Sequence, residues 1–145
     1  MTSSAFWAYG SALQIGDGET SESFTSIAEV TELTPPSMSR DAIEVTSHGS
    51  ADGFREYIPG WRDGGEVSIV ANWLPTDTTH DGTTGLLESY LDDEAHNWRV
   101  VLPDSLATIA FAGFLTAFNP DLPLTEQGKL SCTIKITGKP TVTTT

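Results

Sequence analysis

The sequence predicts a mainly β (α+β) fold, an antiparallel β-sandwich or barrel with one flanking α-helix and a long arm between two strands. Two observations carry this prediction. Roughly six to eight segments alternate apolar with polar residues, a period of two that gives a strand one apolar face. One segment, late in the middle of the chain, has helical periodicity instead. Sequential strands with a single helix are typical of a sheet that packs on itself while the helix closes one side.

The length of 145 residues suits one domain, which buries roughly 68–70% of the surface that its unfolded chain exposes. Cys132 is the single cysteine, so no intramolecular disulfide is expected, in keeping with folding in a reducing cytoplasm. We predict neither a signal peptide nor a transmembrane helix, because no basic residue precedes Arg40 and no long apolar run is present.

The chain is strongly acidic, with 20 Asp and Glu against 7 Lys and Arg and a formal net charge of −13. Proteins that grip DNA neutralise its phosphates with Lys and Arg, so a DNA-gripping function is not expected. An acidic surface suits plain solubility, or a wall past which DNA moves without sticking.

The first predicted element is an N-terminal arm, residues 1–12, which carries Phe6, Trp7 and Tyr9 among small polar residues. Chain ends are usually frayed and polar, so three aromatic side chains here predict docking, either on the chain's own sheet or on a neighbouring subunit. A short strand then enters a turn within residues 13–18, because Gly and Asp supply the backbone conformations that turns require.

Three strands are predicted next, at residues 24–34, 40–46 and 66–72. Between the last two lies an insert, residues 47–65, which is too long for a tight hairpin turn. Its aromatic and arginine residues are Phe54, Arg55, Tyr57, Trp61 and Arg62. Such side chains give large rigid contact area and forked hydrogen bonds. We therefore predict an assembly loop; the alternative is a long hairpin folded back over its own domain.

The polar loop before the helix contains Asp77, His80 and Asp81, which are metal-ligating residue types. No second histidine lies nearby in the sequence, so we predict an ordinary loop and no metal site. The three histidines of the chain belong to no catalytic motif, and we find no nucleophile elbow, phosphate-binding glycine loop or zinc spacing. We therefore predict that the protein is not an enzyme and needs no cofactor.

The one predicted helix spans residues 84–94, with a threonine as its N-cap. Its apolar stripe consists of Leu86, Leu87, Tyr90 and Leu91. The acidic run at residues 92–94 lies at the negative end of the helix dipole, where carboxylates are unfavourable. This run predicts compensation by another molecule or a nearby arginine, or else a solvated acidic corner. Asp92 and His96 are spaced to form a pair.

The last three strands are predicted at residues 97–102, 107–118 and 129–137. The middle one is apolar on both faces, so we expect it to be the most buried strand, with a bulge at Gly113. In the third, Cys132 shares an apolar face with its neighbours at positions 130, 134 and 136, which predicts a small buried side chain. The tail at residues 141–145 has no reason to be ordered by itself.

The order of these pieces carries a family resemblance. The successive motifs are IAEVTELTP (27–35), GGEVSIVANW (64–73), GLL of the helix (85–87), WRVVLPD (98–104), FAGFLT (111–116) and IKITGKP (134–140). In their order and spacing they resemble the tail tube (major tail) protein of long non-contractile-tailed phages and of related phage-like gene transfer particles. The similarity spans residues 15–140.

The resemblance implies a single tail-tube domain over residues 1–145 that assembles into hexameric rings stacked along a tail, with a continuous β-barrel around a lumen. It implies contacts between subunits and rings through the N-terminal arm, the assembly loop and a C-terminal arm, residues 138–145. It also implies synthesis in the host bacterial cytoplasm, a final location in the virion tail and no membrane partner. The implied partners are further copies of the chain, the tail terminator, tape measure and distal tail proteins, and double-stranded DNA that passes without tight binding.

Acidic residues on the strands near the assembly loop are candidates to face that lumen. They are Glu29, Glu32, Glu44 and Glu66. Carboxylates there deny DNA the attraction that phosphates find in Lys and Arg. The alternative function is an acidic β-sandwich binding module, carbohydrate-binding or capsid-decorating, in which Trp61, Trp73 or Trp98 forms an exposed platform and residues 54–61 form a ligand loop.

Overall fold

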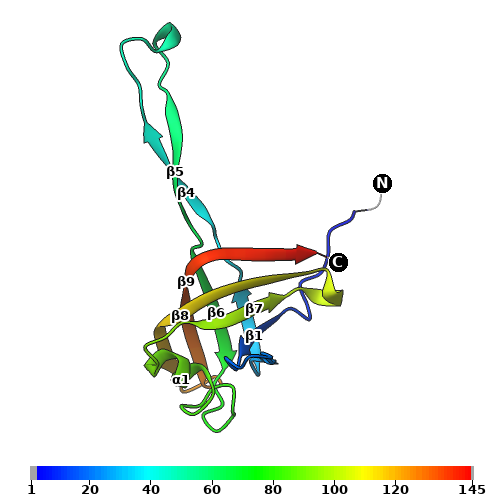
Figure 1. The fold of residues 1–145 in the computed structure, drawn as a ribbon. Helices are drawn as coiled ribbons and strands as arrows, with labels where there is room; N and C mark the ends of the chain where they lie inside the picture. Colours follow the sequence, from blue (N-terminus) through cyan, green and yellow to red (C-terminus); the bar gives the residue numbers. More distant parts are fainter. Residues whose placement is uncertain (1–2, 145) are drawn as a thin grey trace.

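Residues 3–144 are described by the computed structural model. They form a seven-stranded antiparallel sheet in the order β2-β1-β7-β8-β9-β6-β3 and a separate two-stranded sheet of β4 and β5 (Figure 1). The strands are β1 (Ala12–Gly16), β2 (Phe24–Ser26), β3 (Val30–Thr34), β4 (Ser39–Glu44), β5 (Tyr57–Asp63), β6 (Glu66–Asn72), β7 (His96–Val101), β8 (Ala107–Asp121) and β9 (Lys129–Thr144). One α-helix, α1 (Leu86–Leu91), and two short 3-10 turns complete the described part of the chain. The predicted mainly β fold with a single helix is confirmed.

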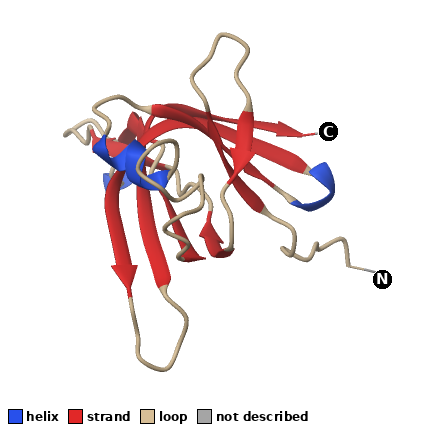
Figure 2. Cartoon of the chain, turned by 90° about the horizontal axis from the view of Figure 1, so that it is seen from below, coloured by secondary structure: helices blue, strands red, loops and turns tan. Residues whose placement is uncertain are grey.

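The two longest strands, β8 and β9, are shared by two layers. The first half of β9 pairs with β6, whereas its second half, from Thr137 onward, pairs with β8 alone. β7 pairs with β8 only from Thr108 to Gly113, and the rest of β8 continues beside β9. Gly138, with a φ of 83°, lies where the register between β9 and β8 shifts, and the sheet curves over on itself (Figure 2). The result is a sandwich in which β8 and β9 each run from one layer into the other.

The core lies between these layers and is formed by the apolar face of each strand. Leu13 of β1, Ile69 of β6 and Trp98 of β7 are fully buried and belong to one cluster. The Trp98 indole Nε1 donates a hydrogen bond to the Gly113 carbonyl oxygen at 3.1 Å, so burial leaves its one polar atom satisfied. Cys132 is buried in the same cluster, as the alternation in β9 predicts.

Gly113 serves close packing and is not the bulge that the sequence predicts. The register shifts of β8 lie on either side of it, at residues 110–112 and 115–117. A side chain at Gly113 would collide with the carbonyl oxygen of Lys135, so only glycine permits this approach. The expectation that β8 is the most buried strand is also wrong, because β6 and residues 129–136 of β9 bury every second residue, whereas β8 has three buried residues among its 15.

The single strand predicted at residues 24–34 is in fact two strands, β2 and β3, separated by a turn. Glu29 in this turn has a φ of 59°, and its carbonyl oxygen accepts a hydrogen bond from the Asn72 amide at 2.9 Å. The turn carries the chain from β2 at one edge of the sheet to β3 at the other. An apolar residue at every third position would also suit a short helix, so the sequence pattern does not reveal this break.

α1 is shorter than the predicted helix of residues 84–94. It follows a glycine N-cap without a side-chain hydrogen bond and ends at Leu91, so the acidic run at 92–94 lies beyond the helix. Leu86 is fully buried, but Tyr90 and Leu91 are exposed, so only part of the predicted stripe packs on the body. A six-residue helix is too short to be stable alone and depends on its contact with the sheet.

Residues 141–144 belong to β9, whereas a free tail was expected at residues 141–145. Thr141 lies opposite Ala110 and Thr144 opposite Ala107, so β9 stays paired with β8 throughout. Residue 145, and residues 1–2 of the predicted N-terminal arm, lie outside the described residues. Between residues 3 and 144, no helix is long and apolar enough to cross a membrane.

Candidate assembly surfaces

An antiparallel ribbon of β4 and β5, which we call the arm (residues 39–63), projects from the body (Figure 1). The two strands pair along their whole length, with a register shift after Arg40. The irregular loop predicted at residues 47–65 is therefore shorter, because residues 57–63 are a strand that pairs with β4. The arm extends away from the sandwich, so it is not a hairpin folded back over its own domain.

The tip of the arm, residues 45–56, is held by its own hydrogen bonds. The Val45 amide donates to the Glu56 carbonyl oxygen at 2.9 Å, and the Ser50 hydroxyl donates to the Glu56 carboxylate at 2.9 Å. Asp52 and Gly53 adopt left-handed conformations, with φ of 54° and 72°, which reverse the chain. The tip therefore has a defined shape without a hydrophobic core.

The arm exposes apolar side chains that have no partner within the subunit body. Trp61 is 85% exposed, and Ile43 and Ile58 on the two strands are also exposed. All the predicted contact residues lie exposed on it: Phe54, Arg55, Tyr57, Trp61 and Arg62. An isolated two-stranded ribbon is only marginally stable in water, and exposed apolar patches mark interaction sites. The arm thus has the character of a surface that another molecule covers.

The root of the arm is fixed to the body. Asp63 of β5 forms an ion pair with Lys135 of β9, Oδ1 to Nζ, at 2.9 Å, and accepts a hydrogen bond from the Gly65 amide at 2.8 Å. The Gly65 hydrogen bond and then Lys135 lower the pKa of Asp63 below its ordinary value. Gly65 has a φ of 82°, and a side chain there would overlap the Ser37 carbonyl oxygen. These contacts set the direction in which the arm leaves the sandwich.

The N-terminal segment carries a second group of exposed aromatic side chains. The rings of Trp7 and Tyr9 stack with their centroids 5.0 Å apart, and both residues, with Phe6, are exposed to solvent. Docking on the chain's own sheet is therefore not what the structure shows. Docking on a neighbouring subunit stays a prediction.

The four acids predicted to face a lumen do not share one surface. Glu32 of β3 and Glu66 of β6 lie on the solvent face of the sheet, away from the core. Glu29 lies in the turn between β2 and β3, and Glu44 lies on the arm. Only the first two can belong to one sheet face.

That same sheet face also carries lysines, which the sequence pattern did not single out. Lys135 lies opposite Glu66 and Lys129 lies opposite Asn72. Lys129 forms an ion pair with Glu126 at 2.7 Å. The alternation in β9 could have revealed these lysines. If Cys132 is buried, the odd-numbered residues of the first half of β9, which include both lysines, lie on the solvent side. The face is therefore polar and mixed in charge.

Within the described part of the chain, two strand edges at the sides of this face have no strand paired to them. β3 is the last strand of its sheet, and residues 114–121 of β8 pair with β9 alone. Among residues 3–144, no further strand covers either edge. Unpaired N–H and C=O groups on an open edge are a template for pairing with another chain.

His80, one of the predicted metal-ligating types, has a structural role in its loop. It is buried, its Nδ1 accepts a hydrogen bond from the Leu74 amide at 3.1 Å, and its Nε2 lies 2.8 Å from the Ala28 carbonyl oxygen. Because an amide can only donate, Nδ1 is the acceptor and Nε2 carries the proton. Asp77 and Asp81 accept hydrogen bonds from residues of the same loop, which lower the pKa of both carboxyl groups.

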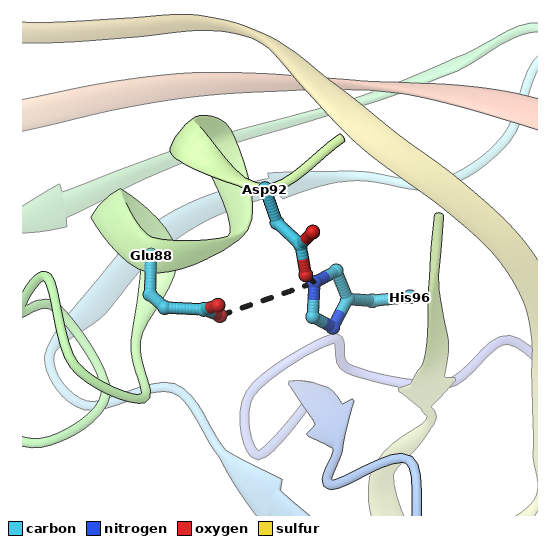
Figure 3. A group of neighbouring side chains, drawn as sticks. All are labelled: Glu88, Asp92 and His96. Atoms are coloured by element: carbon cyan, nitrogen blue, oxygen red, sulfur yellow. Dashed lines mark hydrogen bonds and ion pairs between the residues drawn. The ribbon is translucent and has the colours of Figure 1, made fainter. Parts of the chain in front are cut away.

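A second histidine cluster lies where α1 meets β7. The predicted pair forms, with Asp92 Oδ2 3.1 Å from His96 Nε2, and Glu88 adds a second carboxylate whose Oε2 lies 3.9 Å from the same nitrogen (Figure 3). Glu88 was not singled out from the sequence, although it precedes Asp92 by four positions, the spacing that brings two side chains together on a helix.

The tryptophans proposed for a binding platform do not form one. Trp98 is fully buried, and Trp73 is half-buried against the core. Of the three, only Trp61 is strongly exposed, and it lies on the arm. The alternative of a binding module therefore loses its exposed aromatic platform.

The chain matches one protein family and several solved structures. The family model described as "Lambda phage tail tube protein, TTP" matches residues 7–143. A chain from the virion of a native gene transfer agent particle has a TM-score of 0.76 at 18% identity, covering 96% of this chain and 99% of that chain. No curated protein sequence matches.

Two further structures have the same fold. A chain from the tail of an empty gene transfer agent particle, with C6 symmetry, has a TM-score of 0.72 at 21% identity over 90% of this chain and 95% of that chain. A chain from the SPP1 tail tube has a TM-score of 0.67 at 10% identity, covering 93% and 77% respectively. Both superpose along almost the whole of the present chain.

Proposed function

This chain belongs to the lambda phage tail tube protein family, and from that premise we infer how its surfaces build a tube. It is a structural virion protein of a phage or phage-like particle tail, and its family and fold are those of structural subunits rather than enzymes. In our proposal, copies of it form hexameric rings that stack into a hollow tube, through which DNA passes into the host cell.

The projecting arm is the observation that carries this proposal. It exposes Trp61 and other apolar side chains on a ribbon that has little support of its own. A fixed root aims it away from the sandwich. Covering such a ribbon with the next ring removes apolar surface from water, which favours association. We assign the arm, anchored by Phe54, Tyr57 and Trp61, to contacts between rings.

The two open strand edges support closure within a ring. β3 ends one side of the solvent face and residues 114–121 of β8 end the other. If β3 of one subunit pairs with β8 of the next, the four-stranded face β3-β6-β9-β8 continues around the ring as one barrel. Each junction would satisfy backbone groups that are otherwise left to water.

The face that would then line the lumen carries Glu32 and Glu66 among serine and threonine residues. Glu66 is directly opposite Lys135, which itself pairs with Asp63. Lysines tied to carboxylates are poor partners for phosphate, and repulsion by the remaining carboxylates is screened beyond about 8 Å at physiological salt. Such a wall does not bind DNA tightly, and its repulsion acts only over a short range, so DNA can slide along the channel.

The remaining assignments rest on the family resemblance. We treat residues 1–145 as a single tail-tube domain and assign Phe6, Trp7 and Tyr9 to a neighbouring subunit. The tail terminator, tape measure and distal tail proteins are the expected partners at the ends and inside of the tube. Residues 138–144 would make contacts as the outer part of β9 rather than as a loose arm.

Negative-stain electron microscopy of the purified protein, before and after concentration, tests tube formation. We expect stacked rings or hollow tubes with a central pore. A matched variant, in which the tip (residues 45–56) is replaced by an Asn-Gly turn, should keep the sandwich and yield single rings at most. Tubes of normal length from this variant would refute a role of the tip in ring stacking, and discrete wild-type monomers at every concentration would refute self-sufficient assembly.

Charge reversal tests the lumen assignment. The double variant Glu32→Lys with Glu66→Lys should still form tubes but deliver DNA more slowly, because lysines on the wall attract phosphates. Glu94→Lys, at an exposed acid outside this face, is the control and should leave delivery unchanged. Infectivity or transfer equal to wild type in the double variant would contradict the assignment.

A further inference from the structure

The cluster of Glu88, Asp92 and His96 has the geometry of a metal site. One donor atom from each residue, two carboxylate oxygens and one imidazole nitrogen, lies within 4.8 Å of the others. His96 Nε2 is 3.1 Å from Asp92 Oδ2 and 3.9 Å from Glu88 Oε2. Ligands about 2.0–2.1 Å from a tetrahedral ion are about 3.3 Å apart, so closing the site requires only a small movement of Glu88.

The three side chains come from different elements and point toward one another (Figure 3). Glu88 lies in α1, Asp92 caps its end, and His96 is the first residue of β7. Their side chains are only 19–33% exposed. Asp92 is also oriented by its other oxygen, Oδ1, which accepts a hydrogen bond from the Glu94 amide at 3.2 Å. Such outer hydrogen bonds hold metal ligands in place.

The charge balance of the cluster favours a bound cation. Within residues 3–144, His96 is the one ion-pair partner of either carboxylate, and the acidic residues at 93 and 94 follow directly. Two neighbouring carboxylates therefore share a single histidine partner, and a divalent ion bound between them would supply positive charge at this point.

The surroundings leave room for such an ion to enter and complete its coordination. The three residues line a recess of about 510 Å³ whose other walls include four threonines of the loop before α1 and Asp17. Hydroxyl groups on the walls can hydrogen-bond water molecules that fill the remaining positions of the ion. The chain's other histidines do not offer this setting, since His80 uses both ring nitrogens for backbone contacts and His48 is exposed at the tip of the arm.

From these observations we propose that Glu88, Asp92 and His96 bind one divalent transition-metal ion of the zinc class. One nitrogen and two oxygen donors suit Zn²⁺, Co²⁺ or Ni²⁺ better than Ca²⁺ or Mg²⁺, which prefer oxygen alone. The ion joins the end of α1 to the start of β7 across residues 92–95, and so stabilises a helix that is too short to persist by itself. The proposal concerns the folded subunit and holds whether or not tubes form.

Isothermal titration of the metal-free protein with Zn²⁺ alone tests the site. We expect one ion per subunit, and a melting temperature that rises with Zn²⁺ and falls back with EDTA. His96→Gln should weaken binding more than 100-fold, since loss of a direct ligand should exceed the roughly 10–100-fold effect of an outer partner. Asp92→Asn, which keeps the shape of the side chain, should also weaken it. The matched control His48→Gln should bind as wild type does.

Two results would refute the metal site itself. One is the absence of saturable one-to-one binding by the wild-type protein, a measurement that does not depend on any variant folding. The other is His96→Gln binding Zn²⁺ with wild-type affinity while its circular dichroism spectrum shows a folded protein. Equal affinity for Ca²⁺ and Zn²⁺ would contradict the assignment to a transition metal.

Discussion

Replacing Trp61 by alanine should separate assembly from folding. The side chain is 85% exposed in the subunit, so its removal should change the free energy of unfolding by less than about 0.5 kcal/mol. A tryptophan offers up to about 250 Å², so a neighbour could cover roughly 210 Å² here. At about 25 cal/mol per Å² this gives a ceiling near ~5 kcal/mol.

Part of that ceiling is lost to the ordering of side chains on association. Central aromatic contacts typically retain about 2–4 kcal/mol, which corresponds to a roughly 30- to 1,000-fold weaker association. We therefore expect Trp61→Ala to raise the critical concentration for tube formation by that factor. The melting temperature of the subunit should stay within about 2 °C of wild type.

Sedimentation of assembled material across a dilution series gives the critical concentration, and electron microscopy confirms that the pellet contains tubes. Tyr90→Ala is the matched control, because it also removes an exposed aromatic side chain but from α1, outside the arm. Unchanged assembly by Trp61→Ala would refute the reasoning. A melting temperature lowered by many degrees would do so as well, since it would mean that Trp61 supports its own subunit.

Three further predictions concern the subunit itself. Leu86→Ala should cost about 2–5 kcal/mol in urea unfolding, whereas Leu91→Ala, exposed on the same helix, should cost less than about 0.5 kcal/mol; equal costs would contradict the packing of α1. Burial raises the pKa of the Cys132 thiol to about 12, so a thiol reagent at pH 8 should label it only after unfolding, and rapid native labelling would contradict its burial. The pKa values of Asp77 and Asp81 are lowered by loop hydrogen bonds, so their stabilisation is complete above the unfolded value of about 3.9 and is lost as pH falls through the lower folded values. Replacing both by Asn should flatten the loss of melting temperature on acidification below about pH 4, and an unchanged profile would argue against these contacts.

The sequence predicted the parts of the fold that depend on local alternation. Cys132 lies in a strand whose apolar and polar residues alternate, and it is buried as expected. The composition of the arm likewise predicted a contact surface for another molecule, because Trp61 and Arg62 are poorly suited to a solvated linker. Both predictions need only the residues that are neighbours in the sequence.

Other features depend on contacts between distant residues and were missed or misplaced. Residues 57–63 pair with β4 rather than serving as a loop, since pairing depends on a partner that alternation does not identify. Gly113 is required by the Lys135 carbonyl on another strand. The face that holds Glu66 also holds Lys135, through a register that the residues of one strand cannot reveal. Glu88 meets His96 only because α1 packs against β8, the strand that pairs with β7.

The shared strand β9 has a consequence for how the subunit forms. It supplies neighbours to both β6 and β8, and β1 likewise pairs with β7 from the far half of the chain. Three pairings of the large sheet, β1 with β7, β3 with β6 and β6 with β9, therefore join strands that are distant in the sequence, and proteins rich in such pairings fold in milliseconds to seconds. The hairpin of the arm is a local pairing, but it contributes nothing to the core. We expect the large sheet to form only after the ribosome has released β9. Each subunit is therefore a monomer until its synthesis ends. The unpaired edges of β3 and β8, which pair with neighbouring subunits in our proposal, then form together in one cooperative folding step.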